Sequence, residues 1–206
     1  MLHKVVQLGG KSYFWLEKTN VVSMIQEYQV SGFRVREYEE LESTNTEAER
    51  VGWSELEDKM VILTYRQTQG RGQVGNHWES EPGKNISMTV VFKPRELPAG
   101  QQFAVSMVIA LGACDFISRY VSGCSVKWPN DIYVGDRKIS GILIEHSIMG
   151  RYVGGSLCGI GVNINQERFL SDAPNPVSLF QLIGKEIPVK RALEELLDCI
   201  GKRYET

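Results

Sequence analysis

Cysteine and histidine are scarce in this sequence, and their spacing is unsuited to metal fingers or disulfide frameworks. Among 206 residues there are four cysteines, at 114, 124, 158 and 199, and three histidines, with no C-x-x-C pair. Zinc fingers need closely spaced ligand pairs, and small disulfide-stapled folds need a higher density of cysteine. We therefore expect reduced thiols, in the core or on the surface.

The sequence also lacks an excess of positive charge and long apolar runs. The formal net charge is −2, which disfavours non-specific nucleic-acid binding because such binding needs a basic face. We find no apolar run approaching the roughly 20 residues that span a bilayer, and the N-terminus lacks a signal-peptide pattern. These absences predict a cytoplasmic protein that binds neither nucleic acid nor membrane.

The composition, 42% hydrophobic and 23% charged, is ordinary for a globular domain with one core. Gly135-Asp136 suits a two-residue hairpin turn, in which glycine takes the positive φ. Thr44 is expected to cap a helix, with Glu47 three residues later as in a capping box. Hydrophobic spacing predicts strands at 60–66, 85–92, 132–134, 139–145 and 152–162, and helices at 21–28, 100–121 and from 188 onward.

The first candidate site is the glycine-rich segment 70–78, which reads GRGQVGNHW. Its glycines allow backbone N–H groups to turn toward an anion, and Arg71 offers a planar guanidinium to a carboxylate or phosphate. The segment fits neither the G-x-x-x-x-G-K-[ST] phosphate loop nor a dinucleotide-binding loop, because no helical pattern follows it. A flexible surface loop is the alternative interpretation.

The second candidate is the segment 127–131, which reads KWPND. It places the Lys127 ammonium at a strand end before a proline-led turn, where it can stabilise negative charge that develops in a reaction. Lys138 and Glu145 follow across the predicted hairpin and bring a second lysine and a carboxylate to the same part of the sheet. A surface turn with Trp128 in the core is the alternative.

Two further segments carry polar residues or glycine where a ligand would need them. Gly159 and Gly161 interrupt a strand, which indicates close approach of another backbone or a ligand, and Asn163 follows them. The run 43–45, SerThrAsn, together with Gln67, supplies the hydrogen-bond donors and acceptors that read a neutral ureido ring. Tight strand packing and simple helix capping are the respective alternatives.

Together these segments resemble biotin–protein ligases, also named biotin–[acetyl-CoA-carboxylase] ligases. The matching pieces occur in family order: ESTN at 42–45, QTQGRGxxGxxW at 67–78, KWPND at 127–131, RKISGILIE at 137–145 and GIGVNIN at 159–165. The resemblance covers about residues 34–204. It implies an α+β fold like that of class II aminoacyl-tRNA synthetases, with a mixed, mostly antiparallel sheet and flanking helices.

The resemblance also implies roles for individual residues. Catalytic roles fall on Lys127 and Arg71. Asp131 is a further catalytic candidate on chemical grounds, as a carboxylate that orients or deprotonates the acceptor amine, and capping of the 129–130 turn explains it equally well. Biotin-binding positions are Ser43, Thr44, Asn45, Gln67, Arg71, Gly72, Gln73, Lys127 and Gly141. Nucleotide-binding positions are Trp78, Asn130, Lys138, Asn163 and Asn165.

The activity implied by the resemblance uses ATP and Mg²⁺ to convert biotin into biotinyl-5′-AMP. Biotin is then transferred to a lysine of the biotin carboxyl carrier protein of a biotin-dependent carboxylase. The family also includes homodimers. Residues 1–33 are expected to be an extension of unknown role, and 34–206 the catalytic domain, without an N-terminal helix-turn-helix domain and with the C-terminal SH3-like domain missing or truncated.

One residue departs from the family pattern, and two other functions stay open. Many members carry arginine where Gln73 stands, so a cation near the reactive acyl phosphate is replaced by an amide. This motivates the alternative of a non-catalytic biotin-binding module. The other alternative is a lipoate– or octanoate–protein ligase, which shares the fold and a lysine motif but typically has a different glycine loop.

Overall fold

An eight-stranded sheet forms the centre of the computed structural model, which describes residues 5–8, 11–14, 23–73, 76–171 and 175–205. The strand order is β3-β4-β5-β6-β10-β9-β8-β7. The β4–β5 pair is parallel and the other neighbouring pairs are antiparallel, which confirms the predicted mixed, mostly antiparallel sheet. The strands are β3 (Met24–Val30), β4 (Phe33–Tyr38), β5 (Met60–Thr64), β6 (Ile86–Phe92), β7 (Cys124–Lys127), β8 (Asp131–Val134), β9 (Arg137–Met149) and β10 (Tyr152–Val162).

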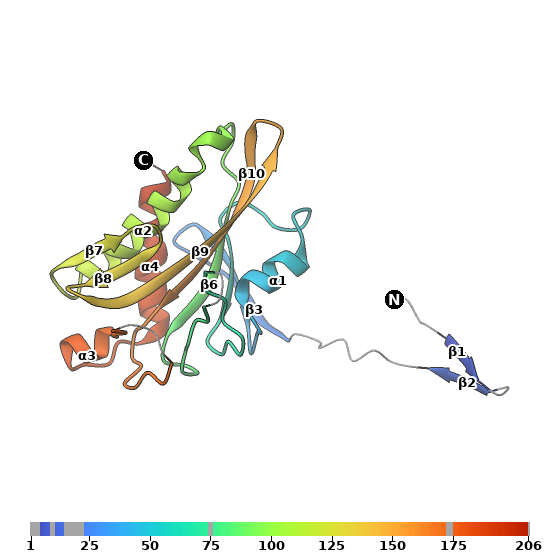
Figure 1. Cartoon of the computed structure of the whole chain (residues 1–206), viewed down its shortest axis with the longest axis horizontal. Helices are drawn as coiled ribbons and strands as arrows, with labels where there is room; N and C mark the ends of the chain where they lie inside the picture. Colours follow the sequence, from blue (N-terminus) through green and yellow to red (C-terminus); the bar gives the residue numbers. More distant parts are fainter. Residues whose placement is uncertain (1–4, 9–10, 15–22, 74–75, 172–174, 206) are drawn as a thin grey trace.

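Helices cover both faces of the sheet. The long helices α2 (Phe103–Ser118) and α4 (Val189–Tyr204) pack together on one face, and α1 (Thr44–Val51) lies on the other (Figure 1). The short elements are η1 (Ala99–Gln101) before α2 and α3 (Leu179–Ile183) before α4. A separate hairpin of β1 (Val5–Leu8) and β2 (Lys11–Phe14) precedes the sheet in the chain.

Alternation along the strands assigns side chains to two faces: one belongs to the main core, and the other carries a smaller apolar cluster together with polar residues. In β6, Ile86, Met88 and Val90 belong to the main core with α2 and α4, as the period of two predicted. Ser87 and Thr89 point to the opposite face, which α1 covers. The hairpin of β8 and β9 and the strand 152–162 are also confirmed, and Gly135 has a φ of 63° in the predicted turn.

The helix predicted for residues 21–28 is wrong where the structure describes it. Residues 24–30 form the edge strand β3, which pairs antiparallel with β4 through the turn at Ser31 and Gly32. The spacing of Met24, Ile25 and Tyr28 suits a helix, but Met24 and Ile25 are exposed and pairing with β4 decides the conformation. Residues 21 and 22 of the predicted helix lie outside the described residues.

The helix predicted for 100–121 forms as α2. It belongs to an apolar helical segment, although we expected no apolar run of bilayer-spanning length. Within the described residues, the helical segment 99–118 is long and apolar enough to cross a bilayer by length and composition. Its Val105, Ile109 and Phe116 are nevertheless buried in the core shared with α4 and the sheet. Such burial is typical of a core helix.

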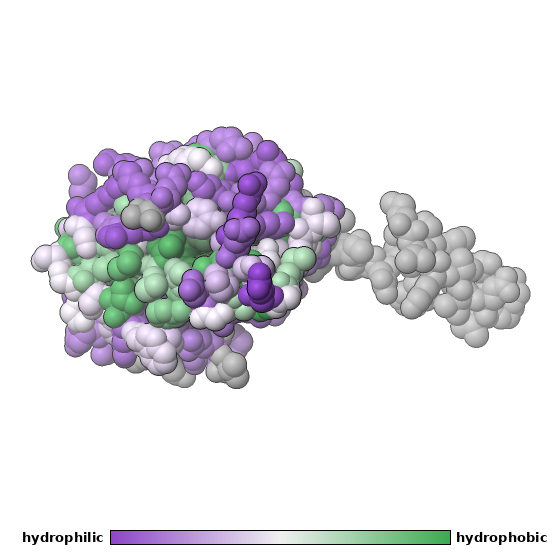
Figure 2. Space-filling view, turned by 90° about the horizontal axis from the view of Figure 1, so that it is seen from above, coloured by the Kyte–Doolittle hydropathy of each residue, from purple (hydrophilic) through white to green (hydrophobic). Residues whose placement is uncertain are grey.

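Part of the apolar surface stays exposed. Figure 2 shows hydrophobic residues gathered on one area of the domain, bordered by hydrophilic ones. Phe103, Met107 and Leu111, whose spacing helped to predict α2, lie on its exposed side, and Trp128 after β7 is 77% exposed. The core assignment considered for Trp128 is therefore wrong.

Close packing of α2 on α4 depends on Gly112, and this gives a test of the fold. A Cβ added there would lie 2.8 Å from the Ile200 Cα. We expect Gly112→Ala to lower the free energy of unfolding by about 1–2 kcal/mol, because overpacking outweighs the helix propensity that alanine adds. Gly100→Ala, where no atom lies within 4 Å of the new Cβ, is the control. Urea unfolding measures both, and equal midpoints would contradict the packing argument.

Candidate functional site

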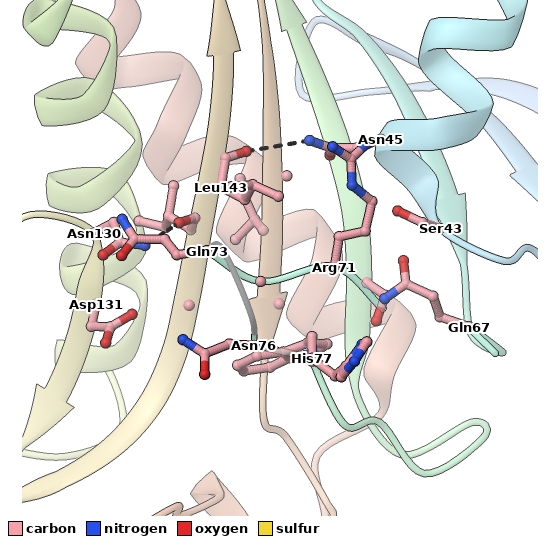
Figure 3. A pocket seen from close by; sticks show the side chains of 18 of the residues that line it. Ser43, Asn45, Gln67, Arg71, Gln73, Asn76, His77, Asn130, Asp131 and Leu143 are labelled. Atoms are coloured by element: carbon pink, nitrogen blue, oxygen red, sulfur yellow. Dashed lines mark hydrogen bonds between the residues drawn. The ribbon is translucent and has the colours of Figure 1, made fainter. Parts of the chain in front are cut away.

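A cavity of about 580 Å³ opens on the sheet face that carries α1. Figure 3 shows side chains reaching it from opposite sides of β9 and β10, with Gln67, Arg71 and Asn45 on one side and Asn130 and Asp131 on the other. Twelve predicted site residues line it: Ser43, Thr44, Asn45, Gln67, Arg71, Gly72, Gln73, Trp78, Asn130, Asp131, Lys138 and Gly141.

Glycines of β9 and β10 form the floor of the cavity. A Cβ added at Gly161 would lie 2.1 Å from the Trp78 indole, and one at Gly141 would lie 3.0 Å from the same ring. At Gly159 the added Cβ would lie 2.4 Å from the Asn45 side-chain oxygen. The predicted close approach at these strand glycines is therefore made by side chains from α1 and from the loop 70–78.

A hydrogen-bonded network of hydroxyl and amide groups forms one end of the cavity. The Thr89 hydroxyl lies 2.9 Å from the Thr44 hydroxyl and 2.6 Å from the Asn45 oxygen. The Gln67 oxygen accepts from the Thr44 N–H at 3.0 Å. Because these groups hold one another, their orientation is fixed before any ligand arrives.

The helix start that supplies this network differs in detail from the prediction. Ser43, not Thr44, is the N-cap of α1, and no side-chain capping bond forms. Glu47 pairs with Arg50 instead of reaching back to the cap. The Thr44 hydroxyl is therefore used toward the cavity floor.

Arg71 lines the cavity beside Asn45, and two carboxylates hold its guanidinium (Figure 3). Its guanidinium lies 2.9 Å from Glu49 and 2.7 Å from Glu145, and the hydrogen bond to Glu49 is the main cause that raises the pKa of Arg71. Glu145 also accepts from the Asn45 amide at 2.8 Å. The arginine thus stays charged and connects α1, β9 and the glycine loop.

Backbone hydrogen bonds form within the described part of the glycine loop. The Gly72 N–H donates to the Asn76 carbonyl at 3.1 Å, and the Asn76 N–H donates to Gln73 at 2.8 Å. These two donors are therefore engaged, whereas the sequence predicted N–H groups turned toward an anion. Val74 and Gly75 lie outside the described residues.

The turn after β7 supplies the other end of the cavity. The Asn130 amide donates to the Ile142 carbonyl, which fixes the turn against β9. Asp131 forms an ion pair with Lys138 at 2.8 Å across the β8–β9 hairpin. The second lysine therefore reaches this part of the sheet, as predicted, but Glu145 does not, because it lies at the other end of the cavity against Asn45 and Arg71.

Lys127 lies beside this end of the cavity but does not line it. Its ammonium is 3.4 Å from the Tyr133 hydroxyl and 4.7 Å from the centre of the Tyr133 ring. Tyr133 does line the cavity. One tyrosine side chain therefore separates Lys127 from the space that Arg71 borders.

Asn163 and Asn165 are buried and lie outside the cavity lining. The Asn163 amide donates to Val177, and Asn165 both donates to and accepts from the backbone of Ile187. The amide nitrogen and the amide oxygen of Asn165 both hold the chain that precedes α4. The expected contact of Asn165 with a nucleotide is thus not supported by this arrangement.

Several lining residues were not singled out from the sequence. Tyr133 and Ser87 belong to strands whose polar face looked unremarkable, although their alternation with buried Ile132 and Met88 was a usable signal. Glu79, which lies outside the lining but accepts from the N–H of the lining residue Ser171, was also missed. Burial alone would raise its pKa, but hydrogen bonds from the Ser171 and Leu170 segment and from Gln166 lower it.

Comparison with known proteins finds relatives in sequence. A model of the Biotin/lipoate A/B protein ligase family matches residues 38–163. The "Bifunctional ligase/repressor BirA" of Bacillus subtilis is 27% identical over 182 residues, covering 85% of this chain and 55% of that protein. The "Biotin--[acetyl-CoA-carboxylase] ligase" of Paracoccus denitrificans is 33% identical over 125 residues, covering 60% of this chain and 51% of that protein.

Solved structures show the same fold. The biotin protein ligase from Aquifex aeolicus in complex with biotin and ATP superimposes with a TM-score of 0.69 at 26% identity, covering 83% of this chain and 70% of that one. The enzyme from Leishmania major with biotinyl-5-AMP gives a TM-score of 0.67 at 22% identity, covering 83% and 75%. This chain spans about half the length of the curated relatives that it matches.

The contact of Trp78 with the glycine floor gives a test of the site geometry. We expect Gly161→Ala to displace the indole, because its new Cβ and the ring would occupy the same space. The Trp78 indole resonance in a ¹H–¹⁵N spectrum, assigned by its loss in Trp78→Phe, should shift clearly. Gly154→Ala is the control, because its Cβ meets only the flexible Met149 side chain. An unmoved resonance in Gly161→Ala would show that the ring does not lie on the floor.

Proposed function

Because this chain belongs to the biotin/lipoate A/B protein ligase family, we propose that it activates biotin with ATP and transfers it to a lysine of a biotin carboxyl carrier protein. The observation that carries the proposal is one cavity lined together by residues 43–45, 67, 71–73, 76–78, 130–131, 138 and 141. Its volume of about 580 Å³ lies in the range of small-molecule sites.

The hydroxyl and amide end of the cavity fits the ureido ring of biotin. A ureido group offers two N–H donors and one carbonyl acceptor, and Ser43, Thr44, Asn45 and Gln67 provide the complementary groups. A linear acyl chain such as lipoate has no group to satisfy them. A ureido ring can use the hydrogen-bonding capacity that these groups keep beyond their mutual bonds, which favours biotin over lipoate or octanoate.

The charged end fits the carboxylate and phosphate chemistry of the first step. The biotin carboxylate attacks the α-phosphorus of ATP and releases pyrophosphate, forming biotinyl-5′-AMP. Catalysis is then mainly positioning and charge stabilisation, for which we assign Lys127, Arg71 and Lys138. Among the described contacts of Lys127 there is no carboxylate, so its charge is the least compensated of the three.

Trp78 and Asn130 border the space that we assign to the nucleotide. Mg²⁺ would enter as the magnesium complex of ATP, because magnesium prefers phosphate and water oxygens. The described residues include no cluster of three potential metal ligands. Lys138 would gain a phosphate oxygen beside its existing partner Asp131.

In the second step, the neutral ε-amine of the carrier lysine attacks the acyl carbon of the adenylate, and AMP leaves. Asp131 is the carboxylate on the cavity wall at this end, and we propose that it orients the incoming amine. Its ion pair with Lys138 holds the carboxylate in one position.

The deciding experiment is intact mass spectrometry of a biotin carboxyl carrier domain incubated with this protein, biotin and Mg-ATP. We expect a gain of one biotinyl group that requires every component. Thermal shift with biotin and with lipoate accompanies it, since a bound ligand stabilises the fold. Stabilisation by biotin without transfer or pyrophosphate exchange would support a non-catalytic module, and stabilisation by lipoate alone would support the lipoate ligase.

Lys127 gives a separate test of the mechanism. We expect Lys127→Ala to lower biotin-dependent ATP–pyrophosphate exchange by roughly 10²-fold or more, the scale of one preorganised donor to developing charge. Lys59→Ala is the matched control, because Lys59 also lies over a tyrosine ring, that of Tyr204, away from the cavity. Near-normal exchange in Lys127→Ala would remove this lysine from the mechanism.

A further inference from the structure

Two of the four cysteines meet on the face of the sheet opposite the cavity. The Cys114 and Cys124 sulfur atoms are 2.8 Å apart, where α2 packs on the edge strand β7. A disulfide bond needs a sulfur separation of about 2.05 Å, so an approach of about 0.8 Å would join them. Both side chains are partly exposed and therefore reachable by small oxidants.

We propose that Cys114 and Cys124 are a redox modification site at which a low-molecular-weight disulfide, such as oxidised glutathione, installs an intramolecular disulfide. The Cys114 thiolate attacks one glutathione sulfur and releases the first glutathione thiolate. The Cys124 thiolate then attacks the Cys114 sulfur and releases the second. Two electrons pass from the protein to glutathione, and the two thiol protons are lost to solvent or to glutathione.

The order of attack follows from the surroundings of the two thiols. Burial raises the pKa of the Cys124 thiol, so this group supplies little thiolate to the oxidant. Its short distance from Cys114 compensates in the second, intramolecular step. The two other cysteines, Cys158 and Cys199, are buried, and burial raises the pKa of each.

The disulfide would join β7 to α2 on the side of the sheet away from the cavity. Cys124 pairs with Val134, whose side chain belongs to the core with α2. Ser125 pairs with Tyr133, which faces the cavity. Because neighbouring residues of a strand face opposite sides, oxidation at Cys124 acts on the α2 side and ties the edge strand β7 to that helix. This inference does not depend on the proposed ligase activity.

The test uses the full chain equilibrated in oxidised or reduced glutathione, alkylated and digested with trypsin. Cleavage after Arg119 separates peptide 96–119, which contains only Cys114, from peptide 120–127, which contains only Cys124. In the oxidised sample we expect these two peptides to stay linked until a reductant is added. Two of the four thiols should be lost to alkylation.

The variants make the result specific. Cys114→Ser and Cys124→Ser should each abolish the linked peptides, whereas Cys199→Ser should leave them. The oxidised wild type should melt roughly 5 °C or more above the reduced form, and β7 amides should exchange more slowly. A persistent glutathione adduct on Cys114, a link through Cys158 or Cys199, or four free thiols after oxidation would each overturn the proposal.

Discussion

The glycines of β9 and β10 decide where a ligand can lie on this sheet. Gly141, Gly159 and Gly161 occupy strand positions that face α1, where any other residue would fill the cavity with its own side chain. The room they leave is bordered by the Asn45 amide and the Trp78 indole, both in contact with strand backbone. The floor is therefore part of the hydrogen-bonded sheet. A site supported on strands holds its geometry better than one built from loops alone.

The charges around this floor are matched before a ligand binds. Arg71 pairs with Glu49 and Glu145, and Lys138 pairs with Asp131. These ion pairs are partly exposed, and such pairs contribute little net energy. An anionic ligand can therefore exchange places with a carboxylate at small cost, which makes the same arginine suitable both as a connector between α1 and β9 and as a contact for a carboxylate or phosphate.

Local pattern predicted the strands that lie inside the sheet and failed at its edge. In β6, Ile86, Met88 and Val90 alternate with Ser87 and Thr89, and this alternation indicates which face packs on α2 and α4. Residues 24–30 lie at an edge, where Met24 and Ile25 are exposed and their spacing carries no information about burial. Pairing with β4 then decides the conformation, and that contact is not visible in a window of sequence. Twelve predicted site residues line one cavity because the motifs lie near strand ends or on strands that the sheet brings together.

What the motifs did not determine is the partner of each side chain. Asn165 was expected near a nucleotide, but its amide nitrogen and oxygen both bond the backbone of Ile187, 22 residues later. Lys127 lies against Tyr133 because β7 and β8 are neighbours in the sheet, and nothing in KWPND specifies that ring. Alternation along β7 further separates Lys127, beside the cavity-facing Tyr133, from Cys124, beside α2. The four-residue strand β7 therefore presents the Lys127 ammonium to the cavity side of the sheet and the Cys124 thiol to the core. The pleat of the strand keeps these two groups on opposite faces.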